Sequence, residues 1–203
     1  MVSIDEIRKL NDLHNLPKSI HVNKDILLDY RLIDALRSTE QDPRNRVYDF
    51  DVYLEKYGIN LQRGYVWEHC QQNEFIFSIL FEKPLEPVVV IQHIIKDFDF
   101  NKSENSITYV IDGKQRLMTI QKFVRNEFPI IIDGQDVYYK DFDKELQRFF
   151  DSRVNYMTAV VYYSYPDIPI TDDMKIWLFN FYNFSGTPQT EEHKNKLQSL
   201  LKS

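Results

Sequence analysis

The stretch from Thr108 to Ile120 constrains the fold of this chain most, because it joins a strand pattern directly to a helix pattern. It opens with a run of β-branched and aromatic residues, which predicts a short strand. Asp112-Gly113 follows, and apolar residues then recur at helical spacing at Leu117 and Ile120. A strand therefore leads into a helix through a two-residue joint that contains a glycine.

This joint carries the residue types of an anion-binding site. The first N–H groups of a helix lack intrahelical partners, and the helix dipole adds positive potential there. Gly113 has no Cβ that would keep a ligand away from the backbone. Lys114 and Arg116 could hold anionic oxygens, Arg116 in a bidentate manner. Asp112 could orient a metal ion, a ribose hydroxyl or an attacking water.

The same residues also have a purely structural interpretation. Asp-Gly is a common turn pair, and Asp is a good N-cap, so Asp112 could simply start the helix. Lys, Gln and Arg in a first helical turn often form a solvated face. Short motifs of this kind occur often by chance, so the joint alone leaves both interpretations open.

A second unusual stretch runs from Ile59 to Trp67 and places a glutamine beside an arginine. Gln62 and Arg63 could clamp a base edge or a phosphate, while the aromatic side chains of Tyr65 and Trp67 pack or stack. Alternatively, both aromatic residues belong to the core and Arg63 extends along them into water.

Composition excludes several classes of protein. Hydrophobic residues make up 43% of the 203 positions and aromatic residues 14%, which indicates a packed globular chain. The net charge of −6 means that any contact with nucleic acid needs a local basic patch. No apolar run approaches 18 residues, and the N-terminus lacks a signal-peptide pattern. With Cys70 as the single cysteine and no zinc-ligand spacing, we expect a cytoplasmic protein without a disulfide, a zinc site or a membrane contact.

Periodicity predicts the remaining elements. We expect helices over 68–81, 143–151 and 171–182, strands over 88–95 and 154–163, and a β-hairpin at Asp133-Gly134. We also expect a helix around Ile26–Leu36, another over 48–57, a capped helix from Ser3, a polar connection over 96–107 and a last helix from Thr190. This mixture, with hairpins and one strand–helix unit, predicts an α+β fold.

Three separated motifs together resemble one family. They are Gln62-Arg63-x-Tyr65-Val66-Trp67, Ile111-Asp112-Gly113-Lys114-Gln115-Arg116-Leu117 and Asn183-x-x-Gly186-Thr187-Pro188. In this order they resemble the N-terminal domain of GmrSD-type, modification-dependent restriction enzymes, which belongs to the ParB/sulfiredoxin-like superfamily. The resemblance covers roughly residues 50–195. It implies a mixed sheet with packed helices and a C-terminal helical extension.

The resemblance also implies a division of the chain and a set of site residues. We expect an N-terminal helical segment over 1–47, a nucleotide-binding core over 48–165 and C-terminal helices over 166–203. Asp112 and Arg116 would be catalytic, with Asp112 also a ligand of Mg²⁺. The nucleotide phosphates would lie among Gln62, Arg63, Gly113, Lys114, Gln115, Asn183 and Thr187. Lys114 replaces a usual glutamine, Asn60 a frequent proline and Gln189 a usual apolar residue, and the last two put the local backbone in doubt.

The resulting first hypothesis is an Mg²⁺-dependent hydrolase or phosphotransferase acting on a nucleoside triphosphate, in DNA modification, restriction or phage–host conflict. A second is a non-catalytic module that binds DNA or a protein partner, through the aromatic residues near Arg63 and the arginine-containing loop 38–46. A third is a metal-dependent DNA nuclease. The restriction enzymes of this family carry a further nuclease domain with a His-Asn-His type metal site. This sequence has no such constellation, so we do not expect this chain alone to cut DNA, and a separate nuclease or another protein is a candidate partner.

Overall fold

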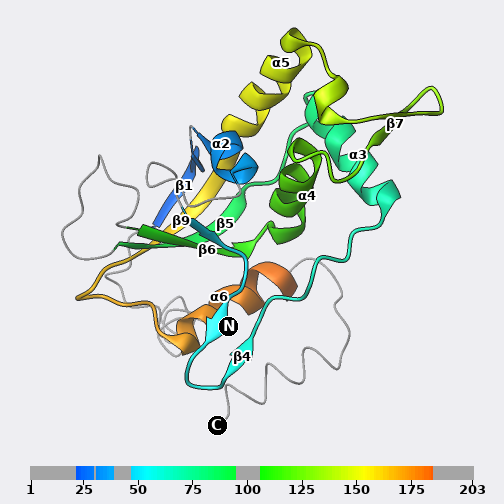
Figure 1. The fold of residues 1–203 in the computed structure, drawn as a ribbon. Coiled ribbons are helices and arrows are strands. Elements are labelled where there is room, and N and C mark those ends of the chain that lie inside the picture. Colours follow the sequence, from blue (N-terminus) through cyan, green and yellow to red (C-terminus); the bar gives the residue numbers. More distant parts are fainter. Residues whose placement is uncertain (1–21, 30, 39–46, 95–105, 185–203) are drawn as a thin grey trace, which may run out of the picture.

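The computed structural model describes residues 22–29, 31–38, 47–94 and 106–184, and its centre is a mixed five-stranded sheet (Figure 1). The strand order is β1-β9-β5-β6-β2, formed by β1 (Val22–Leu27), β9 (Thr158–Ser164), β5 (Val88–Ile94), β6 (Ser106–Asp112) and β2 (Val47–Asp49). β9 pairs with β5 in parallel, and so does β2 with β6, whereas β1–β9 and β5–β6 are antiparallel. Two small hairpins, β3 (Tyr53–Leu54) with β4 (Ile59–Asn60) and β7 (Ile130–Ile132) with β8 (Gln135–Val137), lie outside this sheet.

Helices cover both faces of the sheet, so the fold is α+β, as predicted. One face carries α2 (Leu32–Arg37), α3 (His69–Leu80), α4 (Lys114–Val124) and α5 (Lys144–Asn155), and the other carries α6 (Asp172–Phe184) (Figure 1). The apolar sequence of β5 follows from its position, because both of its faces are buried. Val88 and Val90 pack into the core on the α4 side, while Val89 and Ile91 pack into the core on the α6 side. None of the helices in the described ranges is both long and apolar enough to cross a membrane.

Most of the strongly periodic segments form the predicted elements. The helix over 68–81, the strand over 88–95 and the helix over 171–182 are confirmed as α3, β5 and α6. Asp133 and Gly134 both adopt positive φ in the turn between β7 and β8, as the Asp-Gly pair predicts. The helix expected over 143–151 runs on to Asn155, and β9 therefore begins only at Thr158.

The prediction of a helix over 48–57 is wrong. The segment forms β2, β3 and a turn into β4, in which Gly58 has φ +65°. Tyr48 and Phe50 pack against the core on the α4 side, whereas Val52 and Leu54 belong to the core on the α6 side. The apolar spacing that imitates a helix arises because the chain passes from one core to the other.

The prediction of a helix around Ile26–Leu36 is wrong for the first residues of that segment. Residues up to Leu27 form β1, which pairs with β9, and only Leu32–Arg37 form a helix. The elements expected near Ser3, over 96–107 and from Thr190 lie wholly or mainly outside the described residues. The division at 47 and 165 stays a prediction, with β1 and α2 lying in the sheet and in its helical cover.

Phe123 lies at the centre of the core between the sheet and α5. Its side chain is fully buried, and its ring centroid is 5.6–5.9 Å from those of Phe128, Tyr139, Phe142 and Phe150. We expect Phe123→Ala to lower the free energy of unfolding by about 3–5 kcal/mol, because it leaves a cavity among these rings. Urea denaturation would measure the change.

The matched control is Phe81→Ala, because Phe81 is 65% exposed and its ring stacks on that of Phe77 at the surface. We expect this change to cost about 1 kcal/mol or less. Equal losses for the two variants would contradict the position of Phe123 in the core.

Candidate functional site

The predicted strand–helix joint is present. β6 ends at Asp112, and Gly113 is the N-cap of α4, with φ +100°. Gly113 offers no side chain to cap the helix, so within the described residues the first N–H groups of this 11-residue helix are left for other partners. A Cβ on Gly113 would lie 3.0 Å from Cγ1 of Val88, so glycine is needed here for packing as well as for the positive φ.

The predicted site residues come together around this joint. A cavity of about 190 Å³ is lined by Gln62, Arg63, Trp67, Asp112, Gly113, Lys114, Gln115, Arg116 and Asn183. Every residue predicted for the site is in this set except Thr187, which lies outside the described residues. The three motifs, far apart in the sequence, therefore meet at one end of β6.

Two side-chain amides hold this end of β6. Gln62 Nε2 donates hydrogen bonds to the carbonyl oxygens of Val110 and Ile111, at 2.7 and 3.0 Å. Asn183 Nδ2 donates to the same Ile111 oxygen at 3.3 Å and to that of Phe179 at 3.0 Å. These two amides tie the first and third motifs to the second, and their donors are already engaged by the protein.

Gln115 fixes the loop of the first motif against α4. Its Oε1 accepts a hydrogen bond from the backbone N–H of Val66 at 2.9 Å, and its Nε2 donates to the Gly64 oxygen at 3.1 Å. The side chain thus pairs with loop backbone much as a neighbouring strand would. Tyr65 adds a 2.8 Å hydrogen bond to the buried Thr119 hydroxyl, so the loop is anchored at three successive residues from Gly64 to Val66.

Arg116, for which the sequence suggests bidentate anion binding, has its guanidinium engaged by the protein. Its Nη2 lies 2.9 Å from Asp112 Oδ2 and 3.3 Å from the Pro87 oxygen, and its Nη1 donates to the Glu86 oxygen. The side chain is only 13% exposed. Arg116 therefore ties the segment before β5 to the strand–helix joint, and bidentate anion binding would have to break these contacts.

Lys114 is likewise engaged by the protein. It is 7% exposed, and its Nζ lies 3.0 Å from Oδ1 of Asp51, a residue that the sequence analysis did not select. Asn60 donates to the same oxygen at 2.9 Å and accepts from the backbone N–H of Gln62. Asn60, which departs from the family pattern, thus shapes the turn into the first motif. No local signal marks Asp51, because its role depends on a lysine 63 positions away.

Arg63 differs from the other basic residues of the cavity. It is exposed, and its guanidinium has no hydrogen bond or ion pair with the described part of the chain. The geometry thus leaves Arg63 and the N-terminal N–H groups of α4 as the donors available to an anion.

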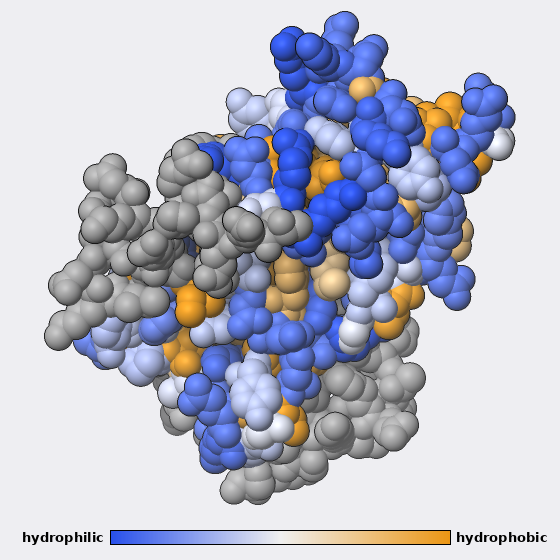
Figure 2. All heavy atoms as spheres, viewed as in Figure 1, coloured by the Kyte–Doolittle hydropathy of each residue, from blue (hydrophilic) through white to orange (hydrophobic). Residues whose placement is uncertain are grey.

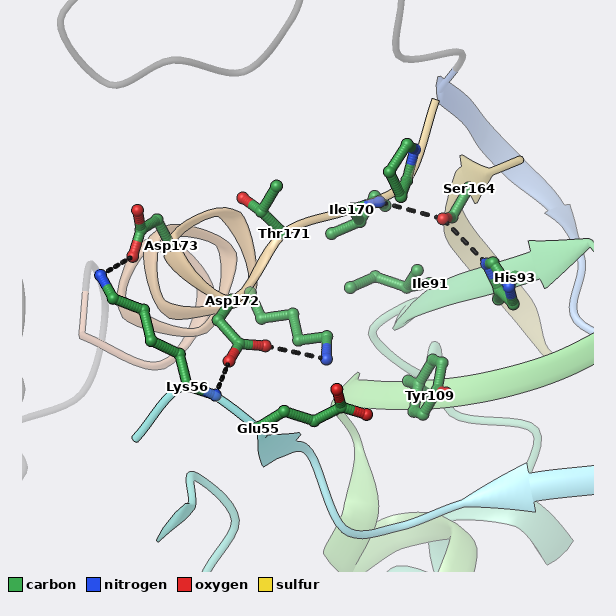
Figure 3. A pocket seen from close by; sticks show the side chains of 12 residues that line it. Glu55, Lys56, Ile91, His93, Tyr109, Ser164, Ile170, Thr171, Asp172 and Asp173 are labelled. Carbon is green, nitrogen blue, oxygen red and sulfur yellow. Dashed lines mark hydrogen bonds and ion pairs between the residues drawn. The ribbon is translucent and has the colours of Figure 1, made fainter. Parts of the chain in front are cut away.

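A larger cavity of about 460 Å³ lies on the α6 side of the sheet and contains none of the predicted residues (Figure 3). Several of its polar side chains bind one another. Lys175 Nζ is 3.2 Å from Asp172 Oδ1, and His93 Nδ1 is 3.0 Å from Ser164 Oγ (Figure 3). Ser164 is buried and accepts from the backbone N–H of Ile170, so these contacts fix the turn that leads into α6.

The two glycines of the site allow a matched test. We expect Gly113→Ala to lower the free energy of unfolding by about 1–3 kcal/mol, because alanine is strained at φ +100° and its Cβ would press on Val88. Gly64 has open space around it and no positive φ, so Gly64→Ala should change stability by less than about 1 kcal/mol. Denaturant midpoints would measure both, and equal effects would contradict this local geometry.

Because Asp51 forms an ion pair with Lys114, we expect the stability loss caused by Asp51→Asn to depend on pH. The hydrogen bond from Asn60, followed by that from Lys114, lowers the pKa of the Asp51 carboxyl. Its stabilising effect is therefore complete above the unfolded pKa of about 3.9 and is lost as the pH falls through the lower folded value. Asp51→Asn should lower the free energy of unfolding by about 1–2 kcal/mol at pH 7. This is less than for a fully buried ion pair, because the Asp51 side chain is 66% exposed and solvent screens the interaction.

Urea denaturation between pH 3 and 7 would measure this difference, which should shrink towards pH 3. Asp136→Asn is the control, because Asp136 is exposed in the hairpin. A loss for Asp51→Asn that stays constant down to pH 3 would be inconsistent with the lowered pKa.

Comparison with known proteins supports the motif resemblance. The sequence model described as the GmrSD restriction endonuclease, N-terminal domain, matches residues 52–203, which include all three motifs. No curated protein and no solved structure matches the chain, so the ParB/sulfiredoxin-like assignment stays a prediction. The match covers most of the chain and every residue that lines the smaller cavity. The chain belongs to the family of GmrSD restriction endonuclease N-terminal domains, which places it in a restriction and modification setting.

Proposed function

We propose that the cavity at the end of β6 binds the phosphate groups of a nucleotide. The observation that carries this proposal is Arg63, a cation with no hydrogen-bond or ion-pair partner among the described residues, which lines the same cavity as the glycine-capped N-terminus of α4. Backbone N–H groups and the helix dipole favour an anion at such a terminus, and a guanidinium matches phosphate oxygens. Lys114 and Arg116 contribute positive charge from the wall without having to leave Asp51 and Asp112.

The size of the cavity indicates which part of the nucleotide it takes. At about 190 Å³ it is smaller than the 300–1,000 Å³ typical of sites that enclose a whole small molecule. We therefore place the phosphates inside and the sugar and base towards the exposed loop of the first motif. Trp67 is a fixed part of this wall, because its ring packs edge-on against Phe75 with centroids 5.3 Å apart.

The residues fit a magnesium ion that arrives with the nucleotide, and not a resident metal. Within the described ranges, no group of three or more His, Cys, Asp or Glu side chains could hold a metal ion. Asp112 has one oxygen in the ion pair with Arg116, and its side chain is 34% exposed. Mg²⁺ in nucleotide sites commonly binds through one or two carboxylates together with the phosphates, and Asp112 would supply such a carboxylate.

In hydrolysis or phosphoryl transfer the protein has mainly to position the phosphates and neutralise their charge. Asp112, fixed by Arg116, would orient the attacking water or hydroxyl, and Arg63 with the α4 N–H groups would stabilise the developing negative charge. Bound Mg²⁺ would supply further charge neutralisation. In a restriction setting, such a reaction would control a nuclease partner during conflict with phage.

A non-catalytic binding module is the second candidate, and one observation favours it. Two of the three basic side chains in the cavity already bind carboxylates, so fewer cations remain for the charge of a transition state. A DNA nuclease acting through its own metal site gains no support from the described residues.

Arg63→Ala tests the proposal, with Arg148→Ala as the matched control because both arginines are exposed. With Mg²⁺-nucleotide at about 100 times the Kd, the wild-type melting temperature should rise by roughly 5–10 °C. Loss of the charged contacts in Arg63→Ala should weaken binding about 10–100-fold. Arg116→Ala is a poorer test, because it also removes contacts to Asp112 and Pro87 that hold the fold together.

Phosphate release from a panel of nucleoside triphosphates would separate turnover from binding. Turnover that falls in Asp112→Asn, with the thermal shift retained, would establish an enzyme. A thermal shift without turnover would establish the binding module. If Arg148→Ala loses the shift and Arg63→Ala keeps it, the phosphates bind elsewhere and the proposal is wrong.

A further inference from the structure

The larger cavity, on the α6 side of the sheet, is separate from the cavity that Arg63 lines. The two share no lining residue. The larger one measures about 460 Å³, within the roughly 300–1,000 Å³ typical of sites that enclose a small molecule. Its walls come from β5, β6, β9, the turn between β3 and β4, and the start of α6. It is therefore a second place at which a ligand could bind.

The sheet forms the floor of this cavity, because several side chains share its α6 face. Ile91 lies opposite Tyr109 in the β5–β6 register, and His93 lies opposite Ser164 in the β5–β9 register. On the other side of β6, Asp49 of β2 lies opposite Tyr109. Residues directly opposite each other point to the same face of a sheet. This face thus carries a phenol and an imidazole, with a carboxylate beside them.

Four of the five charged residues of the lining form ion pairs with one another. Lys175 Nζ lies 3.2 Å from Asp172 Oδ1, and Lys56 Nζ lies 3.8 Å from Asp173 Oδ1. The second oxygen of Asp172 accepts a 2.8 Å hydrogen bond from the backbone N–H of Lys56. Each lysine of the lining therefore has an aspartate partner, and the remaining charge is the negative charge of Glu55.

Three polar groups of the lining are available to a ligand. Within the described ranges, neither the exposed carboxylate of Glu55 nor the hydroxyl of Tyr109 has a hydrogen bond, and Glu55 has no ion pair. His93 contacts Ser164 through Nδ1 at 3.0 Å, and its Nε2 has no partner in the described part of the chain. Figure 3 shows the Glu55 side chain directed toward Tyr109. Burial, and then the charges of Asp49 and Glu55, raise the pKa of the Tyr109 hydroxyl, so it stays neutral.

These groups favour an organic cation over an anion or a metal ion. The carboxylates of Glu55 and Asp49 disfavour an anion beside Tyr109. No group of three or more His, Cys, Asp or Glu side chains in the described ranges could hold a metal ion. An ammonium group has three N–H donors, which one carboxylate and two neutral acceptors can satisfy. Ile91 and Ile170 also line the cavity and offer an apolar wall to the carbon skeleton.

We propose that this cavity binds a small primary amine with an apolar body. The ammonium group pairs with Glu55 and donates to the Tyr109 hydroxyl and to Nε2 of His93, whose proton then lies on Nδ1. Tyr109 acts through its hydroxyl, because Lys175 Nζ already lies 5.6 Å from the centre of its ring. Figure 2 shows a hydrophilic surface over the turn between β3 and β4, where the exposed Glu55 gives the cavity a polar entrance.

Isothermal titration calorimetry with phenethylamine and butylamine tests this proposal, since both carry one positive charge at pH 7. Phenethyl alcohol and phenylacetate are the matched ligands, because they keep the body of phenethylamine and replace its charged end by a neutral or an anionic group. We expect the amines to bind with a Kd of about 1 mM or lower, as suits a small ligand with one charged contact. The alcohol should bind at least about tenfold more weakly, and phenylacetate should not bind.

The protein variants change one group of the cavity at a time. Glu55→Gln should weaken phenethylamine binding about tenfold, because a charge-assisted contact is lost. Tyr109→Phe should weaken it about 2–10-fold, because one acceptor is lost. Glu145→Gln is the matched control, since Glu145 is exposed on α5 and does not line the cavity. Melting temperatures would confirm that all variants are folded.

Mg²⁺-nucleotide binding should stay unchanged in Glu55→Gln, because the two cavities share no lining residue. Three outcomes would overturn the proposal. The first is that neither amine binds the wild type at about 10 mM. The second is that phenethyl alcohol binds as tightly as phenethylamine, which would show recognition of the apolar body alone. The third is an equal loss of binding in Glu55→Gln and Glu145→Gln, which would show a diffuse effect of charge.

Discussion

The hydrogen bonds at the end of β6 are the interaction on which the site depends. Gln62 and Asn183 lie 121 positions apart, and both donate to the carbonyl oxygen of Ile111. These contacts bring the loop of the first motif and the end of α6 to the end of β6, next to the start of α4. Loss of either amide would leave a partly buried carbonyl with one fewer donor and would loosen a motif from the cavity.

The ion pairs around this point decide which charges face a ligand. Asp51 binds Lys114, and Asp112 binds Arg116, so two basic side chains of the second motif act first as structural residues. Each carboxylate neutralises a largely buried cation that would otherwise destabilise the fold. Arg63 stays outside these pairs, and it is therefore the side chain through which the cavity would attract phosphate.

The proposed phosphate site follows from the distribution of charge. The protein is acidic overall, which weakens non-specific attraction to nucleic acid, yet Arg63 is a local basic exception. Its cavity is small and suited to the phosphates of one nucleotide.

The sequence by itself determined the elements with strong local signals and selected most of the residues that line the cavity at the end of β6. The apolar run of β5, the β6–α4 joint and the Asp133-Gly134 turn follow from periodicity and turn chemistry, which act between near neighbours. The three motifs also identified every described residue of the cavity other than Trp67 as a site residue. Only the tertiary structure decided that β2 (Val47–Asp49) pairs with β6, and that Asp51 binds Lys114. This strand and this ion pair depend on partners 60 or more positions away, and no local pattern specifies which partner the fold will bring.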